Sequence, residues 1–100
     1  MTNYSDYLKE VSRSIKAQEG DACLKRFEIN EKVSCEISNY YNAYLDVHVF
    51  LNGDEICDAL FERKKMPRTE KGLGKLCREM LVNYVDENKD VINVYNYLKE

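Results

Sequence analysis

Apolar residues recur along most of the chain at steps of three and four, which is the spacing of a helix that buries one face. The stripe that begins at Tyr4 continues to Ile15 before Gly20 offers a stop, and the stripe from Val33 to Leu51 is the longest. This pattern predicts five or six helices, over approximately residues 4–15, 21–27, 33–51, 54–65, 69–84 and 91–98.

One stretch, written VFLNGDEICDALF, supports two interpretations with opposite consequences. Asn52-Gly53 between apolar runs is the strongest short-range signal of a β-hairpin, because both central residues of a type I′ turn need positive φ. The same residues can instead end one helix in the left-handed conformation, with Asp54 as the N-cap of the next. The steps of three and four through 33–51 outweigh the six β-leaning residues 45–50, so the pattern favours a helix-turn-helix.

Composition supports a helical fold of one domain. One hundred residues suffice for a single core, and 44% hydrophobic with 33% charged residues is typical of a globular chain. One proline and four glycines are too few for the turns of an all-β fold. We therefore expect residues 1–100 to form a single all-α, helical-repeat domain of antiparallel helices, a tetratricopeptide-like solenoid or bundle with its clearest helical hairpin at 33–65.

The net charge of −3 argues against a chain that binds nucleic acid over its whole surface. No apolar run approaches the roughly 20 residues that span a bilayer, and the start MTNYSDYLKE lacks the apolar core of a signal peptide. These features predict an intracellular protein that does not act at a membrane.

Catalytic and metal chemistry have little support in the sequence. The four cysteines form no closely spaced pair, so we expect no metal and no cofactor, and the cysteines are predicted to be small buried hydrophobes. His48, the only histidine, is predicted to be a packed structural residue. Four acidic residues are predicted to cap and solvate the helix after Gly53, and they are Asp54, Glu55, Asp58 and Glu62. No small-molecule substrate is indicated, and we predict that the protein is not an enzyme.

Two groups of residues are candidates for contact with a partner. Tyr40, Tyr41 and Tyr44 cannot all face one buried seam, because neighbouring residues of a helix point about 100° apart. At least one of these rings is therefore a candidate for protein interaction. The densest basic run comprises Arg63, Lys64, Lys65 and Arg68. It suits a solvated helix end, and it is also a candidate nucleic-acid contact or nuclear import signal.

Two stretches resemble a known family. The first is Tyr7-Leu8-x-x-Val11-x-x-x-Ile15-x-x-x-Glu19-Gly20-x-x-Cys23; the second runs from Ala43-Tyr-Leu45 through Asn52-Gly53-Asp54 to Ala59-Leu60, followed by Glu87-Asn88 and Val91 to Tyr95. They are similar to the N-terminal helices of PCI-domain subunits of the nuclear-pore-associated mRNA export complex. The resemblance implies an array of tetratricopeptide-like helices before a winged-helix domain. It also implies a scaffold protein and a small acidic protein as partners, a nuclear location, and basic surfaces that contact RNA.

The sequence ends before a winged helix could begin, so we expect these residues to be the N-terminal part of a longer PCI protein. The leading functional prediction is a non-enzymatic protein-interaction or scaffold segment of an export-complex subunit. The alternative is a free-standing small α-helical regulator or adaptor that binds one protein partner through a Tyr-rich surface.

Overall fold

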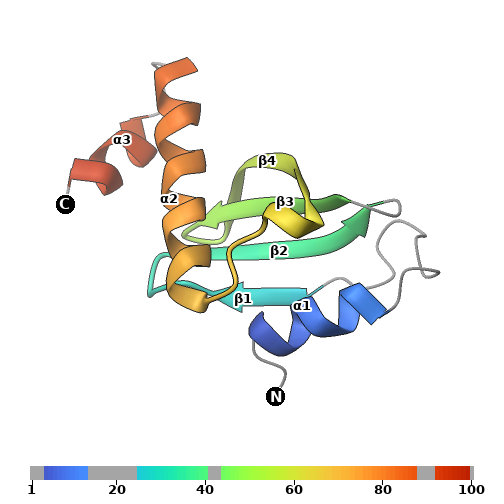
Figure 1. Ribbon diagram of the computed structural model, residues 1–100. Helices are drawn as coiled ribbons and strands as arrows, with labels where there is room; N and C mark the ends of the chain where they lie inside the picture. The colour runs from blue at the N-terminus through green and yellow to red at the C-terminus, as the bar shows by residue number, and fades with distance from the viewer. Residues whose placement is uncertain (1–3, 14–24, 41–43, 88–91, 100) are drawn as a thin grey trace.

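The protein has a mixed α+β fold, in which a four-stranded antiparallel sheet is combined with three helices (Figure 1). The computed structural model describes residues 4–13, 25–40, 44–87 and 92–99. In chain order the elements are α1 (Tyr4–Arg13), β1 (Lys25–Glu28), β2 (Val33–Tyr40), β3 (Tyr44–Leu51), β4 (Asp54–Glu62), the 3₁₀ turn η1 (Arg63–Lys65), α2 (Glu70–Glu87) and α3 (Ile92–Lys99). The prediction of an all-α, helical-repeat fold is wrong.

The four strands lie in chain order, β1-β2-β3-β4, and each is antiparallel to its neighbours. The hairpin between β3 and β4 turns at Asn52 and Gly53, which have φ angles of 53° and 87°. Positive φ at both central residues is the requirement of a type I′ turn, whose twist matches that of the flanking strands. The Asn-Gly pair therefore closes a hairpin, and the helix-turn-helix interpretation of this stretch is wrong.

Strand β3 shows why the segment 33–51 is not a helix. Its side chains alternate between buried and more exposed, and the buried set is Leu45, Val47, Val49 and Leu51. In β2 the buried apolar set is Val33, Cys35 and Ile37. Apolar residues four apart, such as Val33 and Ile37, fit a helical period of 3.6, but four is also a multiple of the strand period of two. The pattern was ambiguous, and the β-branched residues pack here as a sheet.

A bulge near the start of β4 shifts the register of the last strand pair. Phe50 pairs with Glu55, whereas Val49 pairs with Cys57, so Ile56 is the additional residue. Beyond the bulge Cys57, Ala59 and Phe61 lie on the core face of the sheet and pack against the core. Because a shift of one residue exchanges the two faces of a strand, the bulge turns Asp58 and Leu60 to the opposite face.

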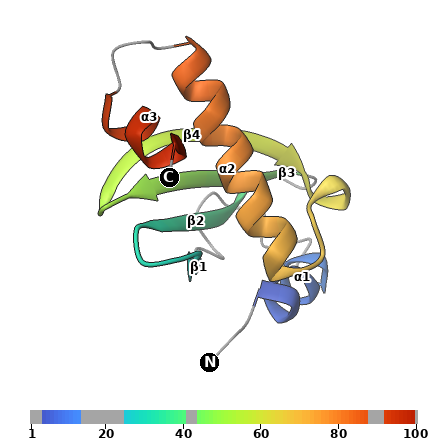
Figure 2. The same cartoon turned by 90° about the vertical axis from the view of Figure 1, so that its left-hand side faces the viewer.

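The helices cover the core face of the sheet. Helix α2 crosses in front of the strands in Figure 2 and buries Leu73, Cys77, Met80 and Leu81. In α1, the rings of Tyr4 and Tyr7 lie edge-on to Phe27 of β1, with centroids 5.6 and 5.4 Å away. The predictions of helices at 4–15, 69–84 and 91–98 are confirmed over the residues that the structure describes, and residues 14, 15 and 91 lie outside them.

Hydrogen bonds from tyrosines fix the outer elements to the rest of the fold. The Tyr4 hydroxyl donates to the Pro67 carbonyl at 2.6 Å, and the Tyr7 hydroxyl donates to the Ile37 carbonyl at 3.1 Å. The segment before α2 is thereby joined to α1.

Cys35 and Cys77 are buried as predicted, and Cys57 is half-buried. Cys23 lies outside the described residues.

The predicted second helix at 21–27 is wrong in the part that the structure describes, where Lys25–Glu28 form β1. Its first residues, 21–24, lie outside the described segments.

None of the helices within the described segments is long and apolar enough to cross a membrane.

Candidate functional site

The face of the sheet opposite α1 and α2 carries mainly polar side chains. On β1 and β2 these side chains form a local network around Arg26, whose guanidinium lies 3.4 Å from Glu36 and donates to the Ser34 hydroxyl at 3.1 Å. The same guanidinium lies 4.8 Å from the ring centroid of Phe50 on β3. On this half of the polar face, Arg26 therefore joins β1, β2 and β3 through an ion pair, a hydrogen bond and a cation–π contact.

The other half of the polar face contains the only histidine, surrounded by carboxylates. Asp46 and His48 are alternate residues of β3 and therefore point to the same side. The register places Asp58 of β4 directly across from His48. The His48 Nε2 atom lies 3.1 Å from Asp46 Oδ2, and Nδ1 lies 3.4 Å from Glu55 Oε2. We call these four residues the Asp/His cluster.

Electrostatics within the Asp/His cluster shift two pKa values upward. Burial raises the pKa of Asp46, and the nearby carboxylate of Asp58 raises it further, while the imidazole of His48 opposes this rise. Burial lowers the pKa of His48, but Asp46, Glu55 and Asp58 together outweigh that effect and leave its pKa above the ordinary value. Within the described part of the chain, no lysine or arginine is among the groups that shift either residue.

Two polar atoms in the cluster lack hydrogen bonds. Asp46 Oδ1 is enclosed and makes no hydrogen bond to the described residues. His48 Nδ1 is also enclosed, and its 3.4 Å contact with Glu55 is an ion pair longer than a good hydrogen bond. The side chains are nevertheless partly open to solvent, with exposed fractions of 20% for Asp46 and 26% for His48. An enclosed polar atom without a partner is costly, so Asp46 Oδ1 is a candidate contact for a bound ion.

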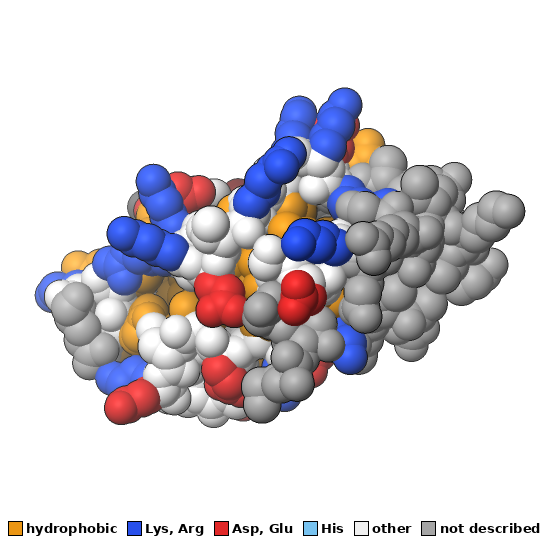
Figure 3. Space-filling model, turned by 60° about the horizontal axis from the view of Figure 1, so that its bottom comes forward, with side chains coloured by type: hydrophobic (Ala, Val, Ile, Leu, Met, Phe, Trp, Pro, Cys, Tyr) orange, Lys and Arg blue, Asp and Glu red, His pale blue; other side chains and the backbone are white. Residues whose placement is uncertain are grey.

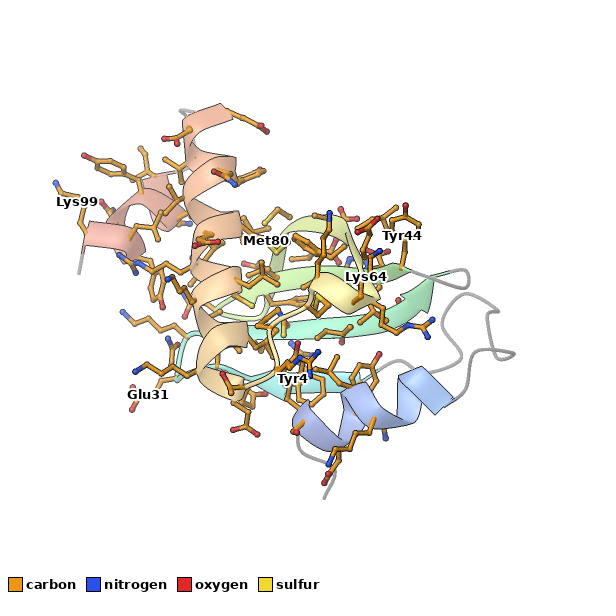
Figure 4. All side chains as sticks on the ribbon, in the orientation of Figure 1. Tyr4, Glu31, Tyr44, Lys64, Met80 and Lys99 are labelled. Carbon is orange, nitrogen blue, oxygen red and sulfur yellow. The ribbon has the colours of Figure 1, made fainter. Side chains whose placement is uncertain are left out.

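The predicted interaction tyrosines are only partly described. Tyr44 begins β3 on the polar face and is 41% exposed, and Figure 4 shows its side chain at the same end of the sheet as Lys64. Tyr40 ends β2, where its backbone pairs with that of Tyr44. Tyr41 lies outside the described residues. The hairpin therefore brings Tyr40 and Tyr44 opposite each other, and their role in protein interaction stays a prediction.

The predicted basic run forms the connection from β4 to α2. Arg63, Lys64 and Lys65 make up η1, and Lys65 forms an ion pair with Glu62 at 3.1 Å. Lys64, Lys65 and Arg68 are exposed, and Arg63 is half-buried. In the face shown in Figure 3, lysines and arginines lie in separate groups with acidic side chains among them. Nucleic-acid contact by these residues stays a prediction.

Sequence reasoning missed the Asp/His cluster because it assigned these residues to two helices. The alternation of Asp46, His48 and Phe50 with buried Leu45, Val47 and Val49 was the available signal for β3. A hairpin centred on Asn52-Gly53 would then have placed β4 beside β3, although only the bulge at Ile56 sets Asp58 across from His48.

Comparisons with known proteins do not supply an assignment. The chain matches no protein-family model, and neither a curated protein nor a solved structure matches it significantly. The resemblance to PCI subunits therefore has no independent support.

Proposed function

We propose that this protein is a non-enzymatic interaction module that binds an extended, basic segment of a partner protein along the outer edge of β4. The observation that carries this proposal is the position of β4 in the sheet. It has nine residues and, among the strands that the structure describes, pairs with β3 alone (Figure 2). A long edge strand presents a row of backbone donors and acceptors to which another strand can add.

The charge of β4 supports a basic partner and opposes a second copy of this chain. The strand contains four acidic residues and no basic one, and its acidic residues are Asp54, Glu55, Asp58 and Glu62. If two copies of β4 paired with each other, these carboxylates would gather across the new strand pair, and like charges on paired strands are destabilising. Lysine or arginine on an added strand would instead form favourable cross-strand pairs.

Apolar side chains beside this edge supply further contact area. Leu60 of β4 is 49% exposed, and Tyr44 on the adjacent strand is 41% exposed. Both belong to the polar face, on which Leu60 pairs with Asp46 and Tyr44 pairs with Glu62. An added strand with alternating basic and apolar residues would place its apolar side chains near Leu60.

The proposal keeps the predicted protein partner and replaces the predicted binding surface. The export-complex resemblance implied binding through helical repeats, and this fold has a sheet in their place. An intracellular location stays part of the proposal. A nuclear location depended on the resemblance and has no further support.

Selection from a displayed library of random decapeptides tests the proposal. We expect the enriched peptides to alternate lysine or arginine with apolar residues, and the best peptide to slow amide hydrogen exchange in β4. The double variant Asp54→Lys/Glu62→Gln should lower the affinity for that peptide by about tenfold, which corresponds to about 1.4 kcal/mol of binding free energy. Glu79→Lys on the exposed side of α2 is the matched control and should bind normally.

Two results would contradict the proposal. One is enrichment of peptides without basic residues. The other is protection from hydrogen exchange in α2 or α3 with none in β4, because the binding site would then lie on the helices.

A further inference from the structure

The Asp/His cluster contains the atoms of a metal site. Asp46, His48 and Asp58 each offer one ligand atom, and these three atoms all lie within 4.8 Å of one another. They come from two adjacent strands, which hold their backbones in a fixed register. In a coordinated ion with metal–ligand bonds of about 2.1 Å, neighbouring ligand atoms are roughly 3 to 3.5 Å apart. Rotation of the three side chains would have to supply the remaining closure to that spacing.

Glu55 supplies an outer contact that metal-bound histidines commonly have. Its Oε2 atom lies 3.4 Å from His48 Nδ1, on the side of the imidazole away from Asp46. A histidine that binds a metal through one nitrogen usually donates its other N–H to a carboxylate, which fixes the tautomer and orients the ring. Glu55 is placed for this contact, and Nε2 is then left to face the ion together with Asp46.

The enclosed Asp46 Oδ1 is a second and independent indication of a ligand. This atom has no hydrogen-bond partner in the described part of the protein, although its side chain is mostly buried. The neighbouring Asp58 carboxylate adds negative charge at the same place. A cation would supply the missing partner and offset the repulsion between the two carboxylates.

We propose that Asp46, His48 and Asp58 bind a divalent transition-metal ion, with His48 coordinating through Nε2 and Glu55 accepting the hydrogen bond from Nδ1. The site shares Asp58 and Glu55 with the acidic set of β4, but it rests on their side chains at the sheet face, whereas partner binding rests on the backbone edge of β4. Solvent reaches it from the polar face, so water completes the coordination sphere.

The donor set selects the class of ion. One imidazole nitrogen and two carboxylate oxygens suit Mn²⁺, Fe²⁺ and Zn²⁺, whereas Mg²⁺ and Ca²⁺ favour sites made of oxygen alone. Thiolates are soft ligands that favour zinc and copper over manganese, so the cysteines do not compete for Mn²⁺. We expect Zn²⁺ to bind more tightly than Mn²⁺, and Mn²⁺ more tightly than Mg²⁺.

Manganese binding to the full chain at about pH 7 tests the site. We expect isothermal titration calorimetry to show one equivalent of Mn²⁺, and the electron paramagnetic resonance signal of free Mn²⁺ to decrease in parallel. His48→Gln and Asp58→Asn should each weaken binding by at least about tenfold, and Glu55→Gln by about tenfold through loss of the outer contact. Glu79→Gln, on the exposed side of α2 and away from the sheet face, should leave the affinity unchanged.

Each outcome decides the question. Loss of binding in the His48 and Asp58 variants with retention in the Glu79 variant supports the site. Asp58 is exposed, so its isosteric replacement should keep the fold even if a change at His48 disturbs it. The proposal is overturned if the wild-type protein binds no Mn²⁺, if the variants bind it equally well, or if Mg²⁺ binds as tightly as Mn²⁺.

Discussion

The turn between β3 and β4 provides the sharpest test of the fold, through the substitution Gly53→Ala. Gly53 has a φ of 87°, and an added Cβ would meet no atom within 4 Å. The new methyl group therefore neither clashes nor gains packing, and only the backbone conformation changes in free energy. For a residue with a Cβ, a left-handed conformation costs about 1–2 kcal/mol.

The unfolded chain reduces this cost. Alanine has fewer accessible conformations than glycine in the unfolded state, which favours folding by about 0.4–1 kcal/mol. The net loss of unfolding free energy should therefore be about 1 kcal/mol. For a domain of this size, that corresponds to a decrease in Tm of about 4–8 °C.

Urea unfolding followed by circular dichroism measures the effect, with Gly74→Ala as the matched control. Gly74 lies inside α2, where an added Cβ would make an ordinary contact of 3.4 Å with Ile29. Alanine favours a helix interior over glycine by up to about 1 kcal/mol, so this variant should be more stable than the wild type. Both substitutions replace glycine by alanine, and they should change the free energy of unfolding in opposite directions. The slope of that free energy against urea concentration should stay the same in both variants.

A Gly53→Ala variant as stable as the wild type would refute the type I′ turn and the hairpin that depends on it. A Gly74→Ala variant less stable than the wild type would show instead that α2 approaches Ile29 more closely than 3.4 Å.

Three further measurements test the core, the α1 contact and the Asp/His cluster. Leu81→Ala should lower the free energy of unfolding by about 2–5 kcal/mol in urea titrations, because Leu81 is fully buried, whereas Val82→Ala on the exposed side of α2 should change it by less than about 0.5 kcal/mol. Tyr4→Phe should lower the free energy of unfolding by about 1 kcal/mol, because it removes the hydrogen bond to Pro67. Burial raises the pKa of Tyr4, so the wild-type protein should lose stability above about pH 10 more steeply than this variant. The pKa of His48 is raised above its ordinary value of 6.5, so this residue stabilises the fold below that pH and less so above it. The wild type should therefore lose stability as pH rises above about 6.5, whereas His48→Gln should not, and equal slopes in thermal melts would contradict this.

The turn at Asn52-Gly53 shows where sequence information was sufficient and was weighed wrongly. Both residues need positive φ in the type I′ turn, and that requirement is local. The apolar spacing of residues 33–51 favoured a helix instead, although apolar residues four apart fit the period of a helix and of a strand equally well. Lateral pairing between strands decided the outcome, and such pairing depends on residues distant in the chain.

The helices show the opposite case. In α2 the adjacent residues Met80 and Leu81 are both apolar, and a strand would point them to opposite faces; in the structure both are buried, together with Leu73 and Cys77. An amphipathic helix needs only a nonpolar surface to pack on, so its period survives in any tertiary context. The two glycines near its start did not prevent the helix from beginning at Glu70.

By itself, the sequence determined three helices, the place of the last turn of the sheet and the burial of two cysteines. The tertiary structure alone decided the bulge at Ile56, and with it which residues of β4 face the core. Both alternating sets of β4 contain apolar side chains, so periodicity cannot choose between them. An unbulged hairpin would bury Asp58, whereas the bulge places Ala59 and Phe61 against the core and Asp58 beside His48. A buried, unpaired carboxylate is costly, and that cost is the physical reason for the register that creates the Asp/His cluster.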